Sequence, residues 1–318
     1  MRLTIVLICL FVVPCLAAGE AGGQPIWGAP VNLGPLINGS DHDSAPDLSQ
    51  DGLTMFYEHI PGDIWTATRP SVGGAWSAPT KLDCPPCTEE FHEMTPSISS
   101  DSLTLYYTST ENVYGPPEEW DLCDNWSVSR ETVTSPWGNK TALPANINTE
   151  YNEYCPEISA DGLMLFIRSD RPGVYGDTDF YVCTRASTTD PWSDPVNLGP
   201  NVNSSKGELR CSISSDGQTL YFTSNRPGGY GEEDIYYSRY VDGEWTAAVN
   251  LGPTINTPYR EVTVEISPDG SELFFSSDRP GGYGHKDLWV AALIPEPATL
   301  SLVVLGALGL VLRKVKRR

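Results

Sequence analysis

The chain has 318 residues with 41 acidic and 20 basic side chains, and its net charge of −21 makes nucleic acid and anionic lipid poor partners. Its 27 prolines, 29 glycines, nine tryptophans and 15 tyrosines are typical of many short strands separated by turns. Cations or neutral polymers suit so acidic a chain better, although a solvated, soluble surface is the simpler explanation.

The first segment has the pattern of an export signal. Arg2 precedes an apolar run over residues 3–16, and small residues follow at positions 17–19. This order of a charged start, an apolar run and small residues predicts a secretory signal peptide over residues 1–18. We therefore expect the rest of the chain to be exported.

Residues 26–293 repeat one unit of about 50 residues. The clearest copy predicts strands over residues 209–214, 219–223, 234–239 and 245–251, with a tight Ser-x-Asp-Gly turn between the first two. A loop rich in proline and glycine joins the second strand to the third. The tryptophan that opens each fourth strand recurs at Trp27, Trp76, Trp137, Trp192 and Trp245.

Five such units predict one continuous all-β domain, a five-bladed β-propeller over residues 26–293, because a small four-stranded sheet cannot bury its faces alone. The array begins with a lone fourth strand at residues 26–33 and ends after a third strand at residues 287–292. We expect the N-terminal strand to complete the last blade, which leaves no sheet edge open.

These units resemble the WD40-like repeat of the PD40 type that forms the propeller of TolB-like proteins. The resemblance rests on the Ser-x-Asp-Gly turns and on three Arg-Pro-Gly-x-Tyr-Gly loops at residues 171–176, 226–231 and 279–284. It implies a binding or scaffolding propeller and supplies no catalytic residue. Blades one and two replace the loop with residues 59–62 and 112–123, so a site there would be specific to this chain.

One acidic residue stands just before the first strand of every unit. First strands line the axis of a propeller, so we expect these five carboxylates at one height around the channel mouth, where a shared cation such as Ca²⁺ would relieve their repulsion. In the alternative interpretation each acid accepts backbone or arginine donors and has a structural role. The five residues are Asp43, Glu93, Glu153, Glu208 and Glu261.

Six cysteines follow the predicted signal peptide, and an even count in an exported chain favours disulfides. Cys155 and Cys211 stand one register position apart on the first strands of adjacent blades, and we predict that they pair. The other candidates are Cys84, Cys87 and Cys123. No βαβ pattern surrounds the Cys-Pro-Pro-Cys sequence, so thiol catalysis is not expected there.

Aromatic side chains gather in the second-blade insertion and the segment that leads into blade three. Aromatic faces beside acids suit neutral sugars, but capping of the adjoining blades explains the same residues. They are Tyr114, Trp120, Trp126, Tyr151 and Tyr154.

The C-terminal residues 294–318 resemble the PEP-CTERM sorting signal. Pro295, Glu296 and Pro297 precede an apolar run at residues 300–312 and a basic tail at residues 313–318. The run is short for a membrane span, and the basic end would stay cytoplasmic. The resemblance implies recognition by an exosortase, processing at Pro-Glu-Pro, and association with exopolysaccharide and the cell surface. A simple membrane anchor is the alternative.

The sequence as a whole predicts an exported surface or matrix propeller that binds a polysaccharide or a surface protein without catalysis. A protein-docking scaffold is one alternative. Another is a glycoside hydrolase, in which acids from different blades meet in a central pocket. The enzyme is less expected, because catalytic carboxylates take different roles and the acids noticed here recur in every repeat.

Overall fold

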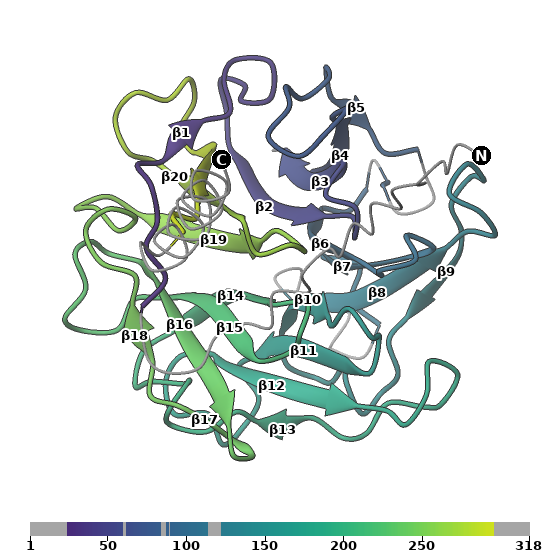
Figure 1. Cartoon of the computed structure of the whole chain (residues 1–318). Helices are drawn as coiled ribbons and strands as arrows, with labels where there is room; N and C mark the ends of the chain where they lie inside the picture. Colours follow the sequence, from purple (N-terminus) through teal and green to yellow (C-terminus); the bar gives the residue numbers. More distant parts are fainter. Residues whose placement is uncertain (1–23, 60–61, 84–86, 89, 114–121, 296–318) are drawn as a thin grey trace, which may run out of the picture.

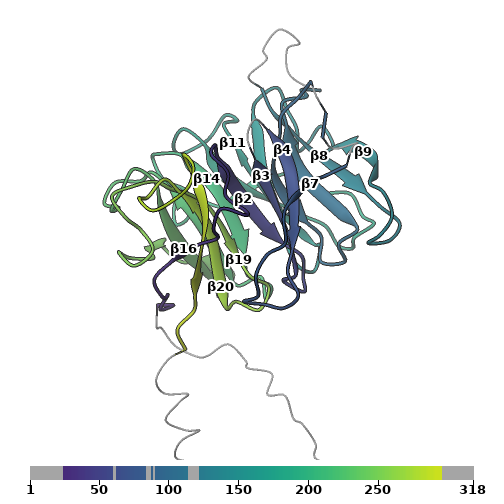
Figure 2. The ribbon, with the colours of Figure 1, turned by 90° about the horizontal axis from the view of Figure 1, so that it is seen from above.

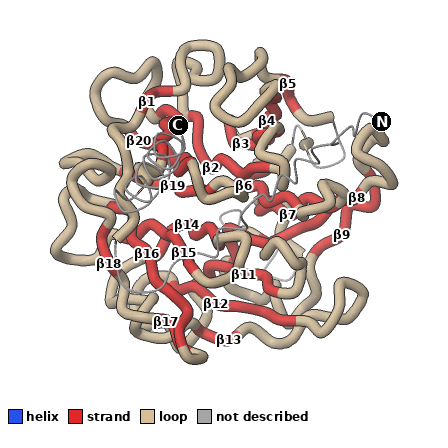
Figure 3. Tube along the Cα trace, in the orientation of Figure 1, coloured by secondary structure: helices blue, strands red, loops and turns tan. Residues whose placement is uncertain are grey.

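The structure, a computed structural model, describes residues 24–59, 62–83, 87–88, 90–113 and 122–295. Five antiparallel sheets stand in a ring (Figure 1), and the described part of the chain consists of strands and loops (Figure 3). The predicted five-bladed all-β propeller is confirmed. None of the described residues belongs to a helix long and apolar enough to cross a membrane. The predicted signal peptide and the C-terminal apolar run lie outside these residues.

Blades one and two follow each other with four strands apiece, each numbered from the axis outward. Blade one contains β2 (Asp43–Leu48), β3 (Thr54–His59), β4 (Asp63–Thr68) and β5 (Thr80–Lys81). Blade two contains β6 (Glu93–Ile98), β7 (Thr104–Ser109), β8 (Asp124–Ser129) and β9 (Gly138–Ala142).

Blades three and four continue the array. Blade three contains β10 (Glu153–Ile158), β11 (Met164–Ser169), β12 (Asp179–Thr184) and β13 (Val196–Asn197). Blade four contains β14 (Glu208–Ile213), β15 (Thr219–Ser224), β16 (Asp234–Val241), β17 (Glu244–Trp245) and β18 (Val249–Asn250). The single fourth strand predicted here is thus divided into two, because Asp242 and Gly243 adopt positive φ angles and turn β17 back on β16.

Blade five is built from both ends of the chain, as predicted. Its strands are β19 (Glu261–Ile266), β20 (Glu272–Ser277), β21 (Asp287–Ala292) and, at the outer edge, β1 (Val31–Asn32). Val31 pairs with Val290, and Trp27 forms a further bridge to Leu293. The ring therefore closes through hydrogen bonds between the first strand and the last.

The Ser-x-Asp-Gly turns explain why first and second strands form tight hairpins. In blade four the Ser214 hydroxyl donates to Asp216 at 2.6 Å, and the Thr219 amide donates back to the Ser214 hydroxyl at 2.9 Å. Gly217 adopts a φ of 69°, and Ser102 takes the equivalent place in blade two with a φ of 59°. The other blades repeat these hydrogen bonds, so the turn is fixed by local sequence.

The two faces of the ring differ, and Figure 2 views the ring from the side. The turn face carries the five hairpin turns between first and second strands, and the loop face carries the loops between second and third strands. The amide of Leu293 donates to the carbonyl of Ser271, directly after the turn at residues 267–270, at 2.8 Å. The described chain therefore ends at the turn face.

Neighbouring blades pack through aromatic side chains and through close backbone approaches. Phe222 in blade four meets Phe180 in blade three edge to face, with 5.9 Å between ring centroids. On the loop face, a Cβ atom on Gly231 would lie 2.1 Å from the carbonyl oxygen of Tyr259 in the linker to blade five. The last glycine of each Arg-Pro-Gly-x-Tyr-Gly loop therefore permits backbone contact with the next blade.

Candidate functional site

Each of the five acids singled out in the sequence is fully buried at the start of its first strand. In blade four, Glu208 accepts hydrogen bonds from the amide and hydroxyl of Ser204 at 3.2 and 2.7 Å. It also accepts from the Ser224 hydroxyl at 3.0 Å and from Nη2 of Arg226 at 3.0 Å. Glu153 and Glu261 have the equivalent threonine, serine and arginine partners in their own blades.

Blades one and two hold their acid without an arginine. Asp43 accepts from the Gly39 amide at 2.6 Å and lies 2.7 Å from Nδ1 of His59. Glu93 accepts from the amide and hydroxyl of Thr88, both at 3.2 Å. Burial raises the pKa of all five carboxyls, and it raises the pKa of Glu93 to about 7.

The five acids thus have their main donors within their own blade or its leading linker. This arrangement agrees with the structural alternative. Binding of a shared Ca²⁺ ion by Asp43, Glu93, Glu153, Glu208 and Glu261 stays a prediction, for which these contacts give no additional support.

A different set of side chains faces the axis, at the fifth residue of each first strand. From blade one to blade five they are Asp47, Ser97, Glu157, Ser212 and Glu265. Each of the first four accepts the backbone amide of the sixth residue in the next blade. These bonds are Ile98 to Asp47 at 3.2 Å, Ile158 to Ser97 at 3.1 Å, Ile213 to Glu157 at 3.1 Å and Ile266 to Ser212 at 3.1 Å.

The fifth junction, between blade five and blade one, lacks this bond. Among the described residues, Oε2 of Glu265 is buried and has no hydrogen-bond partner. Glu265 as a whole is only 5% exposed. An unpaired carboxylate oxygen in so buried a place is costly unless a water molecule or an ion satisfies it.

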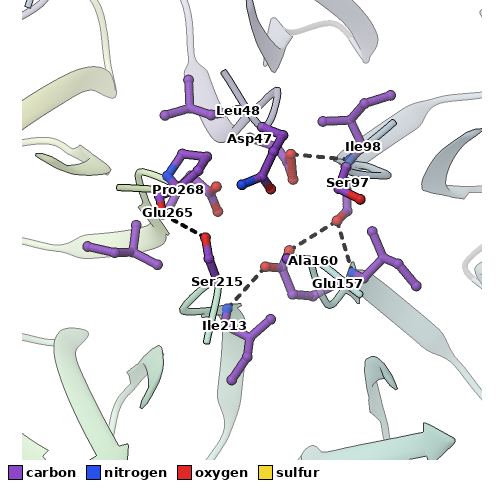
Figure 4. Close-up of a pocket in the computed structure, with 14 residues that line it drawn as sticks. Asp47, Leu48, Ser97, Ile98, Glu157, Ala160, Ile213, Ser215, Glu265 and Pro268 are labelled. Carbon is purple, nitrogen blue, oxygen red and sulfur yellow. Dashed lines mark hydrogen bonds between the residues drawn. The ribbon is translucent and has the colours of Figure 1, made fainter. Parts of the chain in front are cut away.

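Three of these axial residues form a carboxylate cluster (Figure 4). Oxygen atoms of Asp47, Glu157 and Glu265 lie within 4.8 Å of one another, and all three residues are buried. Burial, then repulsion within the cluster, raises the pKa of Asp47 and Glu265 well above the usual range. Burial raises the pKa of Glu157 to about 7, against an opposing effect of Arg210.

Arg210 crosses the axis next to this cluster. It is 2% exposed, and its Nη2 donates to the carbonyls of Pro46 at 3.2 Å and Pro96 at 2.9 Å. The guanidinium therefore joins blade four to blades one and two and fills the channel there. Its charge lowers the pKa of all three carboxyls, although Nε and Nη1 have no hydrogen-bond partner among the described residues.

The cluster lies in a cavity of about 40 Å³ at the turn face. The five hairpin turns form its rim, and one rim residue comes from each blade: Gln50, Ser100, Ala160, Ser215 and Pro268. A water molecule occupies about 30 Å³ of liquid, whereas pockets for small organic ligands start at about 300 Å³. The cavity can hold an ion or water, and a sugar ring does not fit in it.

The repeat pattern does not single out this cluster, because its acids stand in only three of the five repeats. Serine replaces them at Ser97 and Ser212, so the position has no repeating charge. The signal that could have found them is their common place, four residues after the recurring acid. The recurring acids could likewise have been recognised as structural from the serine or threonine four residues before Glu153, Glu208 and Glu261.

The predicted disulfide between Cys155 and Cys211 is absent, and both residues are buried thiols. Arg210, one residue before Cys211, is the equivalent of Cys155 in its blade. Both first strands have a register shift at this place, between Tyr154 and Glu157 and between Glu208 and Cys211, and Cys155 adopts a φ of 52°. Cys211 instead packs with Phe180 and Phe222 between blades three and four.

The remaining cysteine candidates show no feature of a reactive pair. Cys84 lies outside the described residues, and Cys87 is buried with Sγ 3.9 Å from the Ile64 carbonyl. Cys123 is a buried thiol, and burial raises its pKa to about 11. A thiol with so high a pKa is a poor nucleophile at neutral pH.

The aromatic cluster is only partly described, since Tyr114 and Trp120 lie outside the described residues. Trp126 is buried beneath Lys140, with 4.7 Å from Nζ to the ring, and its indole donates to the Glu111 carbonyl at 3.0 Å. Tyr154 is covered by Arg168 at 4.2 Å. A cation covers one face of each ring, which agrees with the alternative that these residues cap their blades.

Residues 293–318 match the family model of the PEP-CTERM protein-sorting motif. The chain carries a PEP-CTERM sorting motif. This motif indicates export and sorting to the cell surface, with an exosortase as the sorting partner. Pro295 is exposed at the end of the described chain, whereas Glu296 and Pro297 lie beyond it. A comparison with curated protein sequences gave no match.

The propeller is similar to many solved structures. TolB from Acinetobacter baumannii is 15% identical with a TM-score of 0.49, over 79% of this chain and 55% of that chain. This chain thus spans about half the length of that protein. An α-L-arabinofuranosidase from Podospora anserina, solved in complex with cellotriose, is 12% identical over 86% of this chain and 98% of that chain, with a TM-score of 0.52.

A gluconolactonase from Xanthomonas campestris is 13% identical with a TM-score of 0.45, over 87% of this chain and 99% of that chain. In total 728 solved chains match. Identities this low indicate a shared fold, and the fold alone does not decide between binding and catalysis.

Proposed function

We propose that this protein is a non-catalytic binding module displayed at the cell surface, which uses its loop face to bind a polysaccharide of the cell's own matrix. The single observation that carries the proposal is the face of the propeller from which the sorting motif starts. Leu293 is held beside Ser271 on the turn face, and the sorting motif begins at residue 293. A propeller attached through this end directs its turn face toward the attachment point and its loop face outward.

The loop face carries the exposed aromatic residues that such a partner needs. Tyr175, Tyr230 and Tyr283 occupy the same place in three consecutive blades and are 52%, 50% and 54% exposed. The backbone holds these loops in place, since the amide of Tyr230 donates to Asp234 at 2.6 Å. A tyrosine presents an apolar ring with a polar tip, and rigid loops reduce the entropy that binding costs.

A non-catalytic role is supported by the size of the channel. Glycoside hydrolysis needs two carboxyl groups on either side of a bound sugar. The only carboxylate cluster found on the axis among the described residues lies in a cavity of about 40 Å³ and is crowded by Arg210. Its acids cannot take the two flanking positions without a large rearrangement.

The test uses full-length protein purified in a mild detergent and a panel of polysaccharides that includes the exopolysaccharide of the source cells. Retention on the polymer and released reducing ends are measured together. We expect retention without release, and we expect the Tyr230→Ala, Tyr283→Ala double variant to weaken retention by about tenfold or more, which corresponds to about 1.4 kcal/mol. Tyr240→Ala is the matched control, because Tyr240 is also exposed but lies toward the turn face.

Two outcomes would contradict the proposal. Release of reducing ends would identify the glycoside hydrolase alternative. Absence of both retention and release would leave the protein-docking alternative, in which the same loop face binds another surface protein.

A further inference from the structure

We propose that the axial carboxylates Asp47, Glu157 and Glu265 form a calcium site that joins blades one, three and five at the turn face. The site is separate from the five recurring acids and from the loop face. It follows from the geometry of the cluster, an unpartnered oxygen, the local charge and the size of the cavity.

The spacing of the oxygen atoms fits one shared ion. Calcium binds oxygen ligands at about 2.3–2.6 Å, so two oxygens on opposite sides of the ion are about 4.6–5.2 Å apart at most. Oxygens of the three carboxylates lie within 4.8 Å of one another. The ligand atoms offered are all oxygens, which favours a hard cation over zinc or copper.

The second observation is the unpartnered Oε2 atom of Glu265. The equivalent side chains in the other four blades accept an amide from the next blade, and this atom accepts none among the described residues. The atom is buried, and the residue is 5% exposed. A bound cation would satisfy it and would replace the missing bond between blades five and one.

The local charge points in the same direction. Three carboxylates lie together, and Arg210 is the cation whose field acts on all of them. Nη2 of Arg210 donates to two backbone carbonyls, and Nε and Nη1 have no hydrogen-bond partner among the described residues, so no hydrogen bond described there joins the guanidinium to the cluster. When all three carboxyls are ionised the cluster and the arginine carry two net negative charges, which one Ca²⁺ ion balances.

The cavity has room for the ion and an entrance for it. Its volume of about 40 Å³ accommodates one cation with a bound water, and its rim of hairpin turns opens to the turn face. Ser97 lines the same cavity and donates its hydroxyl to Oε2 of Glu157 at 3.2 Å, which fixes one of the ligands. The site is therefore partly organised before the ion enters.

The experiment measures calcium binding by full-length protein that has been treated with EDTA and desalted at pH 7.5. Calorimetry is expected to give one Ca²⁺ per chain, with Mg²⁺ binding more weakly, and thermal unfolding is expected to move to higher temperature in calcium. Glu265→Gln should weaken calcium binding by about tenfold or more, because it removes a charged ligand. Glu232→Gln is the matched control, since the Glu232 side chain is 79% exposed.

A purely structural role for Glu265 predicts that Glu265→Gln unfolds at a lower temperature than the unchanged protein in EDTA. The calcium proposal instead predicts the same unfolding temperature or a higher one in EDTA, because the substitution relieves repulsion and breaks no bond of Oε2. Absence of calcium binding to the unchanged protein would overturn the proposal, and so would equal calcium affinity in Glu265→Gln or tighter binding of Mg²⁺. Neither result depends on polysaccharide binding, so the two proposals can fail separately.

Discussion

Blades three to five and blades one and two bury the same acid in two different ways. In the three later blades the glutamate has a serine or threonine before it, a serine on the second strand and an arginine from the Arg-Pro-Gly loop. In blade one His59 takes the place of that second-strand serine, and in blade two the donor to Glu93 found among the described residues is Thr88. Blades three to five thus neutralise the buried carboxylate with an arginine. Blades one and two hold their carboxylate with fewer donors among the described residues.

The position of the arginine shows what the irregular blades have changed. Arg226 follows Ser224 by two residues, and the residue at the same distance from Ser109 in blade two is Glu111. Glu111 pairs with Lys140, which in turn lies over the ring of Trp126. At this position blade two therefore has an acid in place of the arginine. That acid forms an ion pair with Lys140 in the outer part of the blade and does not neutralise the buried Glu93.

The largest expected effect comes from removing the arginine of a regular blade. Arg226→Ala should lower the free energy of unfolding by about 3 kcal/mol, because it leaves the fully buried Glu208 without its cation. Urea unfolding followed by tryptophan fluorescence measures this change. Glu111→Ala, at the equivalent place in blade two, is the control and should cost less than about 1 kcal/mol. Equal losses would mean that the two kinds of blade do not differ.

A smaller effect is expected from the glycine that contacts the next blade. Gly231→Ala should destabilise the protein by about 2 kcal/mol, because the added Cβ would lie 2.1 Å from a backbone carbonyl oxygen that cannot move alone. Gly138→Ala in blade two is the matched control, since no atom lies within 4 Å of its added Cβ. The same urea unfolding experiment compares the two variants. A loss in Gly138→Ala as large as that in Gly231→Ala would contradict the contact argument.

The smallest expected effect is a pH dependence from blade two. Burial raises the pKa of Glu93 to about 7, so the folded protein binds a proton there that the unfolded chain releases near its usual pKa. Stability from this group is therefore present at low pH and is lost as the pH rises through about 7. Between pH 6 and pH 8 the loss should be about 1 kcal/mol. Glu93→Gln should remove this part of the slope, as followed by thermal unfolding at each pH.

The control for this pH series is Glu232→Gln, which changes an exposed carboxyl and should leave the slope as it is. A slope that is the same in Glu93→Gln and in the unchanged protein would contradict a proton uptake by Glu93 in this range.

The fold was predictable because its signals are local and repeated. The Ser-x-Asp-Gly turns fix hairpins within a few residues, and the phase of the repeat indicates that residues 26–33 must complete the last blade. The axial cluster was not predictable in the same way. Asp47, Glu157 and Glu265 are more than 100 residues apart in sequence, and only the curvature of the ring brings their carboxylates together.

The recurring acids fit two interpretations at the level of sequence. Their repetition predicts a shared Ca²⁺ site and fits equally a structural role in each blade. The donors within each blade agree with the structural role, and the shared Ca²⁺ site stays a prediction. Arg210 differs from the recurring acids, since an arginine stands at this position in blade four only. Its side chain reaches across the axis to Pro46 and Pro96. The axial carboxylates and Arg210 depart from the repeat, and they give the axis its local differences in charge.

The pairing of β1 with β21 also sets an order of events during export. Asn32 and Asp287, joined by a side-chain hydrogen bond of 2.8 Å, are 255 residues apart. A chain that leaves the cell from its N-terminal end releases β1 first and must wait for β21, while blades one to four can already form from neighbouring residues. Because β21 ends at Ala292 and the sorting motif begins at residue 293, the strand that completes the ring is followed directly by the sorting motif.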